Sequence, residues 1–188
     1  MTNIKIRSAT ESDRGSIWKI FREIIAAGET YPLDRETSRE DALSYWFQRD
    51  AHVFVAETNA ERVGEVAGFR GTLAASPTVK AQNCEVLGSY ALHANQSGGG
   101  AHVANAAFIV GNNARGQGIG RAMGEHCLAE ARRLGFRALQ FNFVVSTNQS
   151  AVNLWHDLGM KIIGTLPGAF RHPGRGYVDV YVMYQQFI

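Results

Sequence analysis

Cysteine and proline are scarce in this sequence. Its 188 residues include 2 cysteines, Cys84 and Cys127, and 4 prolines, against 20 glycines. Two cysteines without metal-ligand spacing indicate neither a disulfide framework nor a zinc site, so we expect no bound metal. Abundant glycine with little proline predicts tight turns and elements that approach one another closely.

Long apolar runs and a large excess of charge are also missing. No apolar stretch approaches the roughly 20 residues that span a bilayer, and residues 1–5 lack the pattern of a secretory signal. The formal net charge of +2 is too small to favour nucleic acid. We therefore expect a cytoplasmic protein that binds neither membrane nor nucleic acid. One domain is expected over residues 1–188, and a homodimer is an open alternative to a monomer.

Hydrophobic periodicity predicts alternating strands and helices. Ile17, Ile20 and Ile24 recur at helical spacing, which predicts an amphipathic helix over about 13–27. The remaining elements are expected as helices at about 37–49, 118–134 and 149–158 and as strands at 4–6, 52–58, 86–92, 102–110, 138–145, 160–166 and 177–187. This order predicts a mixed α/β (α+β) domain.

Two glycine-rich stretches fall outside these elements. Residues 59–85 are interpreted as an irregular insertion. Residues 168–176 are interpreted as a basic loop before the last strand, which could present Arg171 or Arg175 to a substrate carboxylate or form a solvated hairpin.

A third glycine-rich segment lies between the apolar strand 102–110 and a helix. It reads Arg115-Gly116-Gln117-Gly118-Ile119-Gly120-Arg121. Alternate glycines let backbone N–H groups converge on an anion, and the positive end of the following helix adds attraction. Arg115 and Arg121 could add charge-assisted contacts. The segment predicts a pyrophosphate site, with a plain turn as the alternative. No Lys-Ser/Thr follows as in a P-loop, and a Rossmann unit would place the glycines after the first strand.

Two segments together resemble the GNAT-superfamily acetyltransferases. The loop fits the family pattern Q/R-x-x-G-x-G/A, and residues 148–160 fit the family's asparagine, helix and glycine. The resemblance implies the acyl-CoA N-acyltransferase fold, a mixed central sheet flanked by about four helices. The parallel strands 102–110 and 138–145 should splay in its middle. It also implies acetyl-CoA as the co-substrate.

The same resemblance implies how acetyl-CoA is held. The pantetheine arm should pair with main-chain groups near Ile109 and Val110, like an added strand. Asn148 should hydrogen-bond the arm, with a helix N-cap as its alternative role. Trp155, where most members have tyrosine, belongs to the same cofactor side.

A narrower resemblance concerns the acceptor. Residues 28–32, 44–47, 105–110 and 141–149 are similar to the fungal azetidine-2-carboxylate acetyltransferases, which share Trp155. This resemblance implies a small amine acceptor, an amino acid or cyclic imino acid, held by Asn105 and Asn142. Tyr31 could line the acceptor site or simply join two helices.

The residues themselves support two polar groups in the cleft. Asn105 interrupts an apolar strand, and Asn142 follows a pattern in which Leu139, Phe141 and Phe143 share the opposite face. A buried carboxamide without partners costs about 1–3 kcal/mol, so each needs a hydrogen bond. The alternatives are a ligand, a neighbouring loop, or each other.

The usual acid and base of the family are missing. No glutamate lies in the strand 102–110, and Trp155 cannot replace a tyrosine as an acid. We therefore expect catalysis by positioning, with Asn142 orienting the nucleophile, water carrying protons and a strand amide near Val110 polarising the carbonyl. His93, His102 and His156 are candidate bases, and each has a surface or structural role as its alternative.

Three functions remain open. The first is an N-acetyltransferase for small amino-acid-like or imino-acid acceptors. The second acetylates phosphinothricin or methionine sulfoximine, whose acetyltransferases residues 176–183 resemble, or an antibiotic or a protein N-terminal amine. The third is a non-catalytic acyl-CoA-binding sensor.

Overall fold

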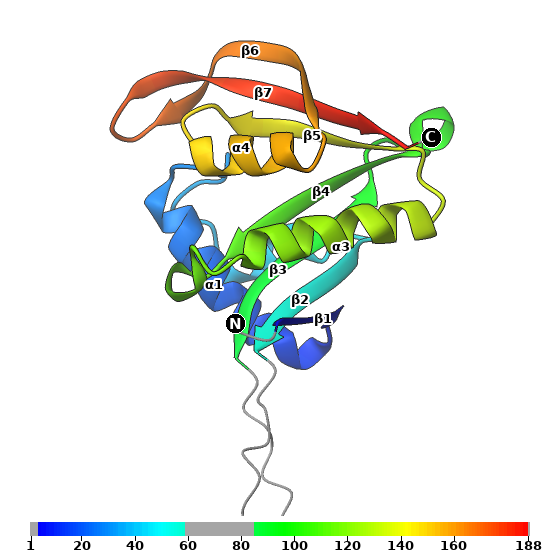
Figure 1. Cartoon of the computed structure of the whole chain (residues 1–188). Coiled ribbons are helices and arrows are strands. Elements are labelled where there is room, and N and C mark those ends of the chain that lie inside the picture. Colours follow the sequence, from blue (N-terminus) through cyan, green and yellow to red (C-terminus); the bar gives the residue numbers. More distant parts are fainter. Residues whose placement is uncertain (1–3, 59–84, 188) are drawn as a thin grey trace, which may run out of the picture.

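A seven-stranded mixed sheet forms the centre of the molecule (Figure 1). The computed structural model describes residues 4–58 and 85–187. The strand order is β1-β2-β3-β4-β5-β7-β6, and only β4 and β5 are parallel neighbours. The strands are β1 (Ile4–Ser8), β2 (His52–Thr58), β3 (Val86–Ala94), β4 (Val103–Val110), β5 (Ala138–Val145), β6 (Lys161–His172) and β7 (Gly176–Gln186). The predicted mixed sheet and order of elements are confirmed.

Four α-helices cover the two faces of the sheet. They are α1 (Arg14–Ala27), α2 (Arg39–Trp46), α3 (Ile119–Arg133) and α4 (Gln149–Asp157). Helices α3 and α4 lie on one face and α1 on the other (Figure 1). Helix α1 ends at Gly28, whose φ of 65° favours glycine. Among the described residues, no helix is long and apolar enough to cross a membrane.

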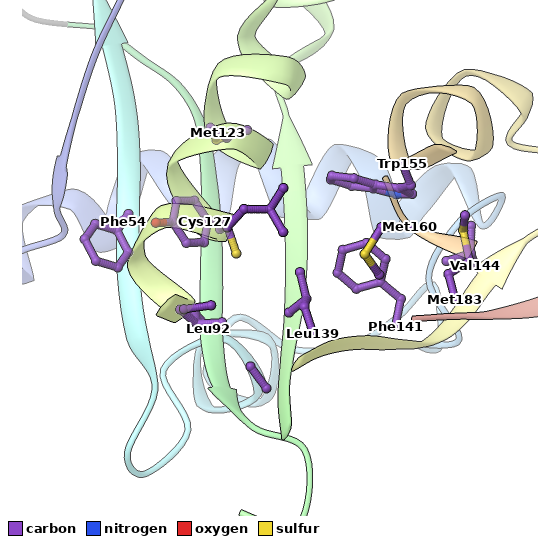
Figure 2. Packing of buried hydrophobic residues seen from close by; sticks show 14 of the residues in the cluster. Phe54, Leu92, Met123, Cys127, Leu139, Phe141, Val144, Trp155, Met160 and Met183 are labelled. Carbon is purple, nitrogen blue, oxygen red and sulfur yellow. The ribbon is translucent and has the colours of Figure 1, made fainter. Parts of the chain in front are cut away.

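The layer beneath α3 and α4 is a continuous apolar core. Figure 2 shows it extending from Phe54 of β2, past Cys127 of α3 and Leu139 of β5, to Met183 of β7. Trp155 of α4 packs on Phe141 of β5, with ring centroids 4.8 Å apart. Burial of each large side chain contributes about 1.5–3 kcal/mol, so this layer fixes both helices to the sheet.

A second apolar layer joins α1 and α2 to the opposite face. Trp46 of α2 is fully buried and lies against Phe21 of α1, with ring centroids 4.9 Å apart. Its indole N–H donates to the Ser89 hydroxyl at 3.0 Å, and that hydroxyl donates to the Phe54 carbonyl at 2.7 Å. This chain of bonds ties α2 to the middle of the sheet.

The two parallel strands separate partway along their length. Their pairing begins at Val103 and Ala138 and ends at Asn105 and Gln140, although both strands continue well beyond that pair. Figure 1 shows β4 and β5 diverging toward their C-terminal ends. The predicted splay is confirmed, and it opens a gap in the middle of the sheet.

Two details of the predicted strands are wrong. A register shift between Phe141 and Val144 interrupts β5, so Phe143 packs with Val145 and Phe170 and does not share the Leu139 face. Such a bulge turns the following side chains toward the other face. The strand predicted at 160–166 is too short, because β6 extends to residue 172 and pairs with β7. Residues 168–176 therefore form the end of a largely exposed hairpin, which was one of the two alternatives for this stretch.

Other boundaries shift less. Helix α2 spans residues 39–46, shorter than the predicted 37–49, because Phe47 leaves the helical conformation. The predicted insertion at 59–85 falls almost entirely outside the described residues, apart from Glu85 at its end.

An ion cluster at the start of α1 should make stability sensitive to acid. Arg7 contacts Asp13 at 2.7 Å and Glu57 at 2.9 Å, and both carboxylate side chains are 6% exposed. The hydrogen bond from Arg7, opposed in part by burial, lowers the pKa of Asp13 to about 2. Because this pKa lies below the unfolded value of about 3.9, the stabilisation is complete above pH 4. It is lost as pH falls from about 4 to about 2.

We expect Asp13→Asn to remove this acid dependence. At pH 7 the variant should lose on the order of 2 kcal/mol of unfolding free energy. Between pH 4 and pH 2 it should lose less further stability than the wild type. Urea unfolding at pH 7, pH 4 and pH 2 measures these losses of unfolding free energy. The control is Asp50→Asn, because Asp50 is an exposed turn residue with a 3.9 Å contact to Arg49. Parallel acid curves for wild type and Asp13→Asn would contradict the assignment.

Candidate active site

A cavity of about 690 Å³ occupies the gap between β4 and β5. One end is formed by the glycine loop and the first turns of α3 and α4. The other is formed by the loop between α1 and α2, by α2 itself, and by polar side chains of β3, β4 and β5. The cavity therefore joins the two faces of the sheet through its splayed centre.

The glycine loop forms the cradle at one end. Gly116 and Gly118 have φ values of 74° and 81°, which disfavour other residues, and no atom lies within 4 Å of a Cβ built on either. Ala122 N–H makes the first helical bond, to the Gly118 carbonyl at 3.0 Å. The preceding amides, including those of Ile119 and Gly120, lie in the first helical turn, where N–H groups lack helical acceptors. Such a turn beside open space can bind an anion.

Two glycines of α3 allow α4 to come close. A Cβ on Gly120 would lie 3.3 Å from Leu154, and one on Gly124 would lie 2.5 Å from Leu158 and 3.0 Å from Trp155. The sequence predicted Gly120 only as part of the pyrophosphate site. The structure shows that it also lets α4 pack closely against α3. Gly124 was missed, because a glycine inside a predicted helix does not reveal which helix it faces.

The polar side chains of the loop differ in their partners. Arg115 lines the cavity and is exposed. Arg121 also lines it, and pairs with Asp157 of α4 at 2.6 Å. An exposed ion pair is worth at most about 1 kcal/mol, so a bound phosphate can compete for this guanidinium. Gln117 donates to the Asn113 carbonyl at 2.8 Å and supports the loop from outside the cavity lining.

Asn148 and Trp155 bring α4 to the cavity. The side-chain Oδ1 of Asn148 accepts from the Ala151 N–H at 3.3 Å and from the Ser150 hydroxyl at 3.0 Å, so Asn148 is the N-cap of α4. That cap leaves its NH2 group for another acceptor. Trp155 is 8% exposed and lies against Phe108 of β4, with ring centroids 4.7 Å apart. Both residues line the cavity, and their role on the cofactor side stays a prediction.

Hydrogen bonds at the ends of β4 fix which peptide groups face the gap. Gly111 N–H donates to a β3 carbonyl at 2.8 Å, and the Val103 carbonyl accepts from Asn95 at 2.8 Å. On the other edge, the His102 carbonyl accepts from Arg137 at 2.8 Å. Because peptide directions alternate in a strand, odd-numbered residues of β4 bond to β3 and even-numbered residues face β5.

This alternation separates Ile109 from Val110. Ile109 is 1% exposed and packs in the layer of α1 and α2, with its peptide directed to β3. Val110 lines the cavity, and the Phe108 carbonyl on the same edge accepts from the Tyr31 hydroxyl at 2.9 Å. The main chain facing the gap is therefore that of Phe108 and Val110 and not that of Ile109.

Asn105 and Asn142 line the cavity from opposite strands. Asn142 donates to Asn95 at 2.6 Å and accepts from Gln140 at 2.8 Å, so the predicted alternative of pairing with a nearby loop is realised for this residue. Asn105 is half-buried, and its side chain makes no hydrogen bond to any other described residue.

The three candidate histidines occupy different places. His93 of β3 lines the cavity. His102 is exposed, with its Nδ1 3.1 Å from the Gly99 carbonyl, and His156 is exposed on α4. Neither of these lines the cavity, and neither do Arg171 and Arg175.

The charge of the cavity is unevenly distributed. Among the described lining residues there is no aspartate, glutamate or lysine, and both arginines lie at the cradle end. The far end carries neutral polar groups, including Thr30, Gln48 and the Tyr45 hydroxyl. Burial raises the pKa of Tyr31 well above its usual value near 10, and burial also raises that of Tyr45. Both phenols therefore stay protonated at neutral pH.

Known proteins share this architecture. The model of the acetyltransferase (GNAT) family matches residues 18–160. N-acetyltransferase aca1 of Schizosaccharomyces pombe is 31% identical over 165 residues, which cover 87% of this chain and 75% of that protein. A GCN5-related N-acetyltransferase from Kribbella flavida superposes with a TM-score of 0.82 at 40% identity, covering 98% of each chain.

A more distant structure shares the fold. The phosphinothricin acetyltransferase from Sinorhizobium meliloti in complex with acetyl-CoA has a TM-score of 0.76 at 20% identity, covering 100% of this chain and 89% of that one. The match over residues 18–160 spans the cradle, both splayed strands and the cap of α4. The chain belongs to the acetyltransferase (GNAT) family.

Proposed function

We propose that this enzyme transfers the acetyl group of acetyl-CoA to the nitrogen of a small amino-acid-like or cyclic imino-acid acceptor. The observation that carries the proposal is the pair of carboxamides, Asn105 and Asn142, facing one cavity from the two splayed strands. A carboxamide both donates and accepts hydrogen bonds, so two of them can hold an amine and a carboxylate of one small molecule.

The cradle end suits the donor. The pyrophosphate of acetyl-CoA would lie on the amides before α3, within reach of Arg115 and Arg121. The pantetheine arm would follow the even-numbered edge of β4 past Val110, with the Asn148 NH2 group beside it. The thioester would then lie in the gap between the strands.

The far end favours a small acceptor of low net charge. The whole cavity measures about 690 Å³ and must also hold the acetyl-pantetheine arm. No arginine, lysine, aspartate or glutamate is among the described side chains at this end, whereas a phosphinate group would call for a cation. A zwitterionic imino acid is small and has no net charge, so it fits this end better than phosphinothricin or the N-terminus of a folded protein.

The chemistry needs no covalent enzyme intermediate. The neutral amine attacks the thioester carbon, the C–N bond forms, and the carbonyl electron pair moves to oxygen. An N–H of the even-numbered β4 edge can donate to that oxygen. The carbonyl then re-forms, the C–S bond breaks, and a proton on the attacking nitrogen passes to the thiolate.

Release of free CoA thiol tests the acceptor class. Azetidine-2-carboxylate and proline analogues should be acetylated with a higher kcat/KM than phosphinothricin, methionine sulfoximine, an aminoglycoside or a tetrapeptide. Preference for one of the latter would overturn the acceptor class. Binding of acetyl-CoA without turnover of any amine would support an acyl-CoA-binding sensor instead.

Asn142→Ala should separate the acceptor from the donor. We expect a 10- to 100-fold loss of kcat/KM for the acceptor, about 1.4–2.8 kcal/mol, with acetyl-CoA affinity within twofold of wild type. Asn153→Ala is the matched control, since Asn153 is exposed on α4 and its side chain accepts from Gln149 at 2.8 Å. Loss of acetyl-CoA affinity alone in Asn142→Ala would contradict the assignment.

A further inference from the structure

We propose that His93 is the general base that takes the proton from the acceptor ammonium. The proposal rests on the proposed function, because it assumes an amine in the far end of the cavity. The sequence led us to expect water as the proton carrier and left three histidines open as candidate bases. The proposal selects one of these three.

The sheet register places His93 beside the carboxamides. His93 of β3 lies directly opposite Asn105 of β4 in the antiparallel ladder, which puts their Cβ atoms about 5 Å apart on one face. Asn105 is in turn the last residue of β4 that pairs with β5, at Gln140, before the strands separate. His93, Asn105 and Asn142 all line the cavity. An amine bound by the carboxamides would therefore be a neighbour of the imidazole.

A hydrogen bond sets the tautomer of the ring. The Nδ1 atom lies 2.8 Å from the Ala94 carbonyl oxygen. Because a carbonyl can only accept, Nδ1 carries the hydrogen in the neutral ring and Nε2 keeps its lone pair. Nε2 is then the atom that can accept a proton. The backbone contact also limits rotation of the ring, as an orienting partner does for a catalytic base.

Other groups around the cavity cannot serve as this base. No carboxylate or lysine is among its described lining residues. The titratable groups that face the same space are the phenols of Tyr31 and Tyr45 and the guanidiniums of Arg115 and Arg121. Burial raises the pKa of both phenols, a guanidinium offers only hydrogen-bond donors, and the carboxamides on β4 and β5 are not bases. His93 is the one described lining side chain that offers a ring nitrogen lone pair to accept this proton.

The step balances with acetyl-CoA as the only co-reactant. Nε2 takes one proton from the ammonium, which frees the nitrogen lone pair for attack on the thioester carbon. The C–N bond forms and the C–S bond breaks, and the sulfur leaves with the bonding pair. The remaining N–H proton goes to that thiolate. The imidazolium then releases its proton to solvent.

His93→Gln should slow acetylation and change its pH dependence. At neutral pH we expect a loss of about 100-fold in kcat/KM for the acceptor, the usual size of one general-base contribution. Without a base the variant depends on the small fraction of neutral amine. Its kcat/KM should therefore rise about tenfold per pH unit up to the amine pKa, whereas the wild-type value levels off. The ratio of wild type to variant should fall as pH rises.

A control and a rescue separate chemistry from structure. His102→Gln, at an exposed ring bonded to the Gly99 carbonyl, should leave both rate and pH profile unchanged. His93→Ala should regain at least tenfold activity with added imidazole, and His102→Ala should not respond. Acetyl-CoA affinity and unfolding temperature verify that each variant is folded. A His93→Gln variant within threefold of wild type, or a ratio independent of pH, would overturn the proposal.

The acceptor and the base can fail separately. If the wild type prefers a different amine, the proposed acceptor class is wrong, and the His93 variants are measured with that amine, whose ammonium also needs a base. If imino acids are acetylated and the His93 variants keep full activity, the base is wrong and the function stands. A wild type inactive toward every amine would overturn both.

Discussion

Replacing Gly118 by aspartate is expected to lower acetyl-CoA affinity roughly 100- to 1,000-fold, and replacing it by asparagine far less. Gly118 has a φ of 81°, and a Cβ there would point into open space. Asparagine and aspartate are the residues besides glycine that best tolerate this conformation, so both variants should keep the loop. They have nearly the same size and differ in charge. A carboxylate at the cradle would meet the pyrophosphate, and like charges in contact cost several kcal/mol.

Comparing the two variants isolates the electrostatic contribution to the loss of acetyl-CoA affinity. Acetyl-CoA binding by calorimetry should show about a tenfold loss for Gly118→Asn, from blocking of the amides, and a further loss of at least tenfold for Gly118→Asp. The extra loss should shrink in high salt. Gly135 provides matched controls, because its φ is 85°, no atom lies within 4 Å of its Cβ, and it lies beyond the other end of α3. Equal affinities for Gly118→Asn and Gly118→Asp would show that the cradle does not bind an anion.

The conformation of the glycine loop follows from the sequence because its signals are local. Glycine spacing, the apolar strand before it and the helix after it all lie within residues 102–134. The left-handed φ values of Gly116 and Gly118 and the start of α3 at Ile119 follow directly from that pattern. The same holds for the Asn148 cap, which depends on a contact three residues away.

The far end of the cavity could not be predicted to the same extent, because its contacts are long-range. Asn142 bonds Asn95, which is 47 residues away in the sequence, just after β3. The position of His93 depends on the pairing of β3 with β4, and a shift of one residue would have put its side chain on the other face. The bulge that moves Phe143 away from the Leu139 face likewise arises from pairing with β7. Strand register depends on pairing between segments that are distant in the sequence. The local sequence pattern therefore did not determine the partner of Asn142, the face that His93 occupies or the position of Phe143.

Tyr31 belongs both to the aromatic layer of α1 and α2 and to the wall of the cavity. It was predicted only as a residue of the loop between two helices that could face the acceptor. Its ring lies 5.1 Å from Phe21 and 6.4 Å from Trp46, between centroids, and its hydroxyl reaches the Phe108 carbonyl at the splayed edge. The aromatic layer of α1 and α2 therefore fixes the wall of the cavity. Damage to that layer should affect both stability and acceptor binding.

Trp46→Ala is expected to lower the free energy of unfolding by about 3–5 kcal/mol, the range for removing a fully buried aromatic side chain. Trp46 is 0% exposed, packs on Phe21, and holds the Ser89 hydroxyl. Trp46→Phe keeps most of the ring and loses the indole N–H. Because the Ser89 hydroxyl still donates to Phe54, this variant should lose only about 1–2 kcal/mol. Urea unfolding followed by circular dichroism measures all three proteins.

A tryptophan in the same layer gives the control for size. Trp18 is only partly buried against this cluster, so Trp18→Ala should cost about half as much as Trp46→Ala or less. At a temperature where Trp46→Ala is still folded, its KM for the acceptor should rise while acetyl-CoA affinity stays within twofold of wild type, since Trp46 lines the cavity far from the cradle. Equal destabilisation by both alanine variants would mean that α2 is not anchored through Trp46. A matching loss of acetyl-CoA affinity would mean that the two ends of the cavity are not independent.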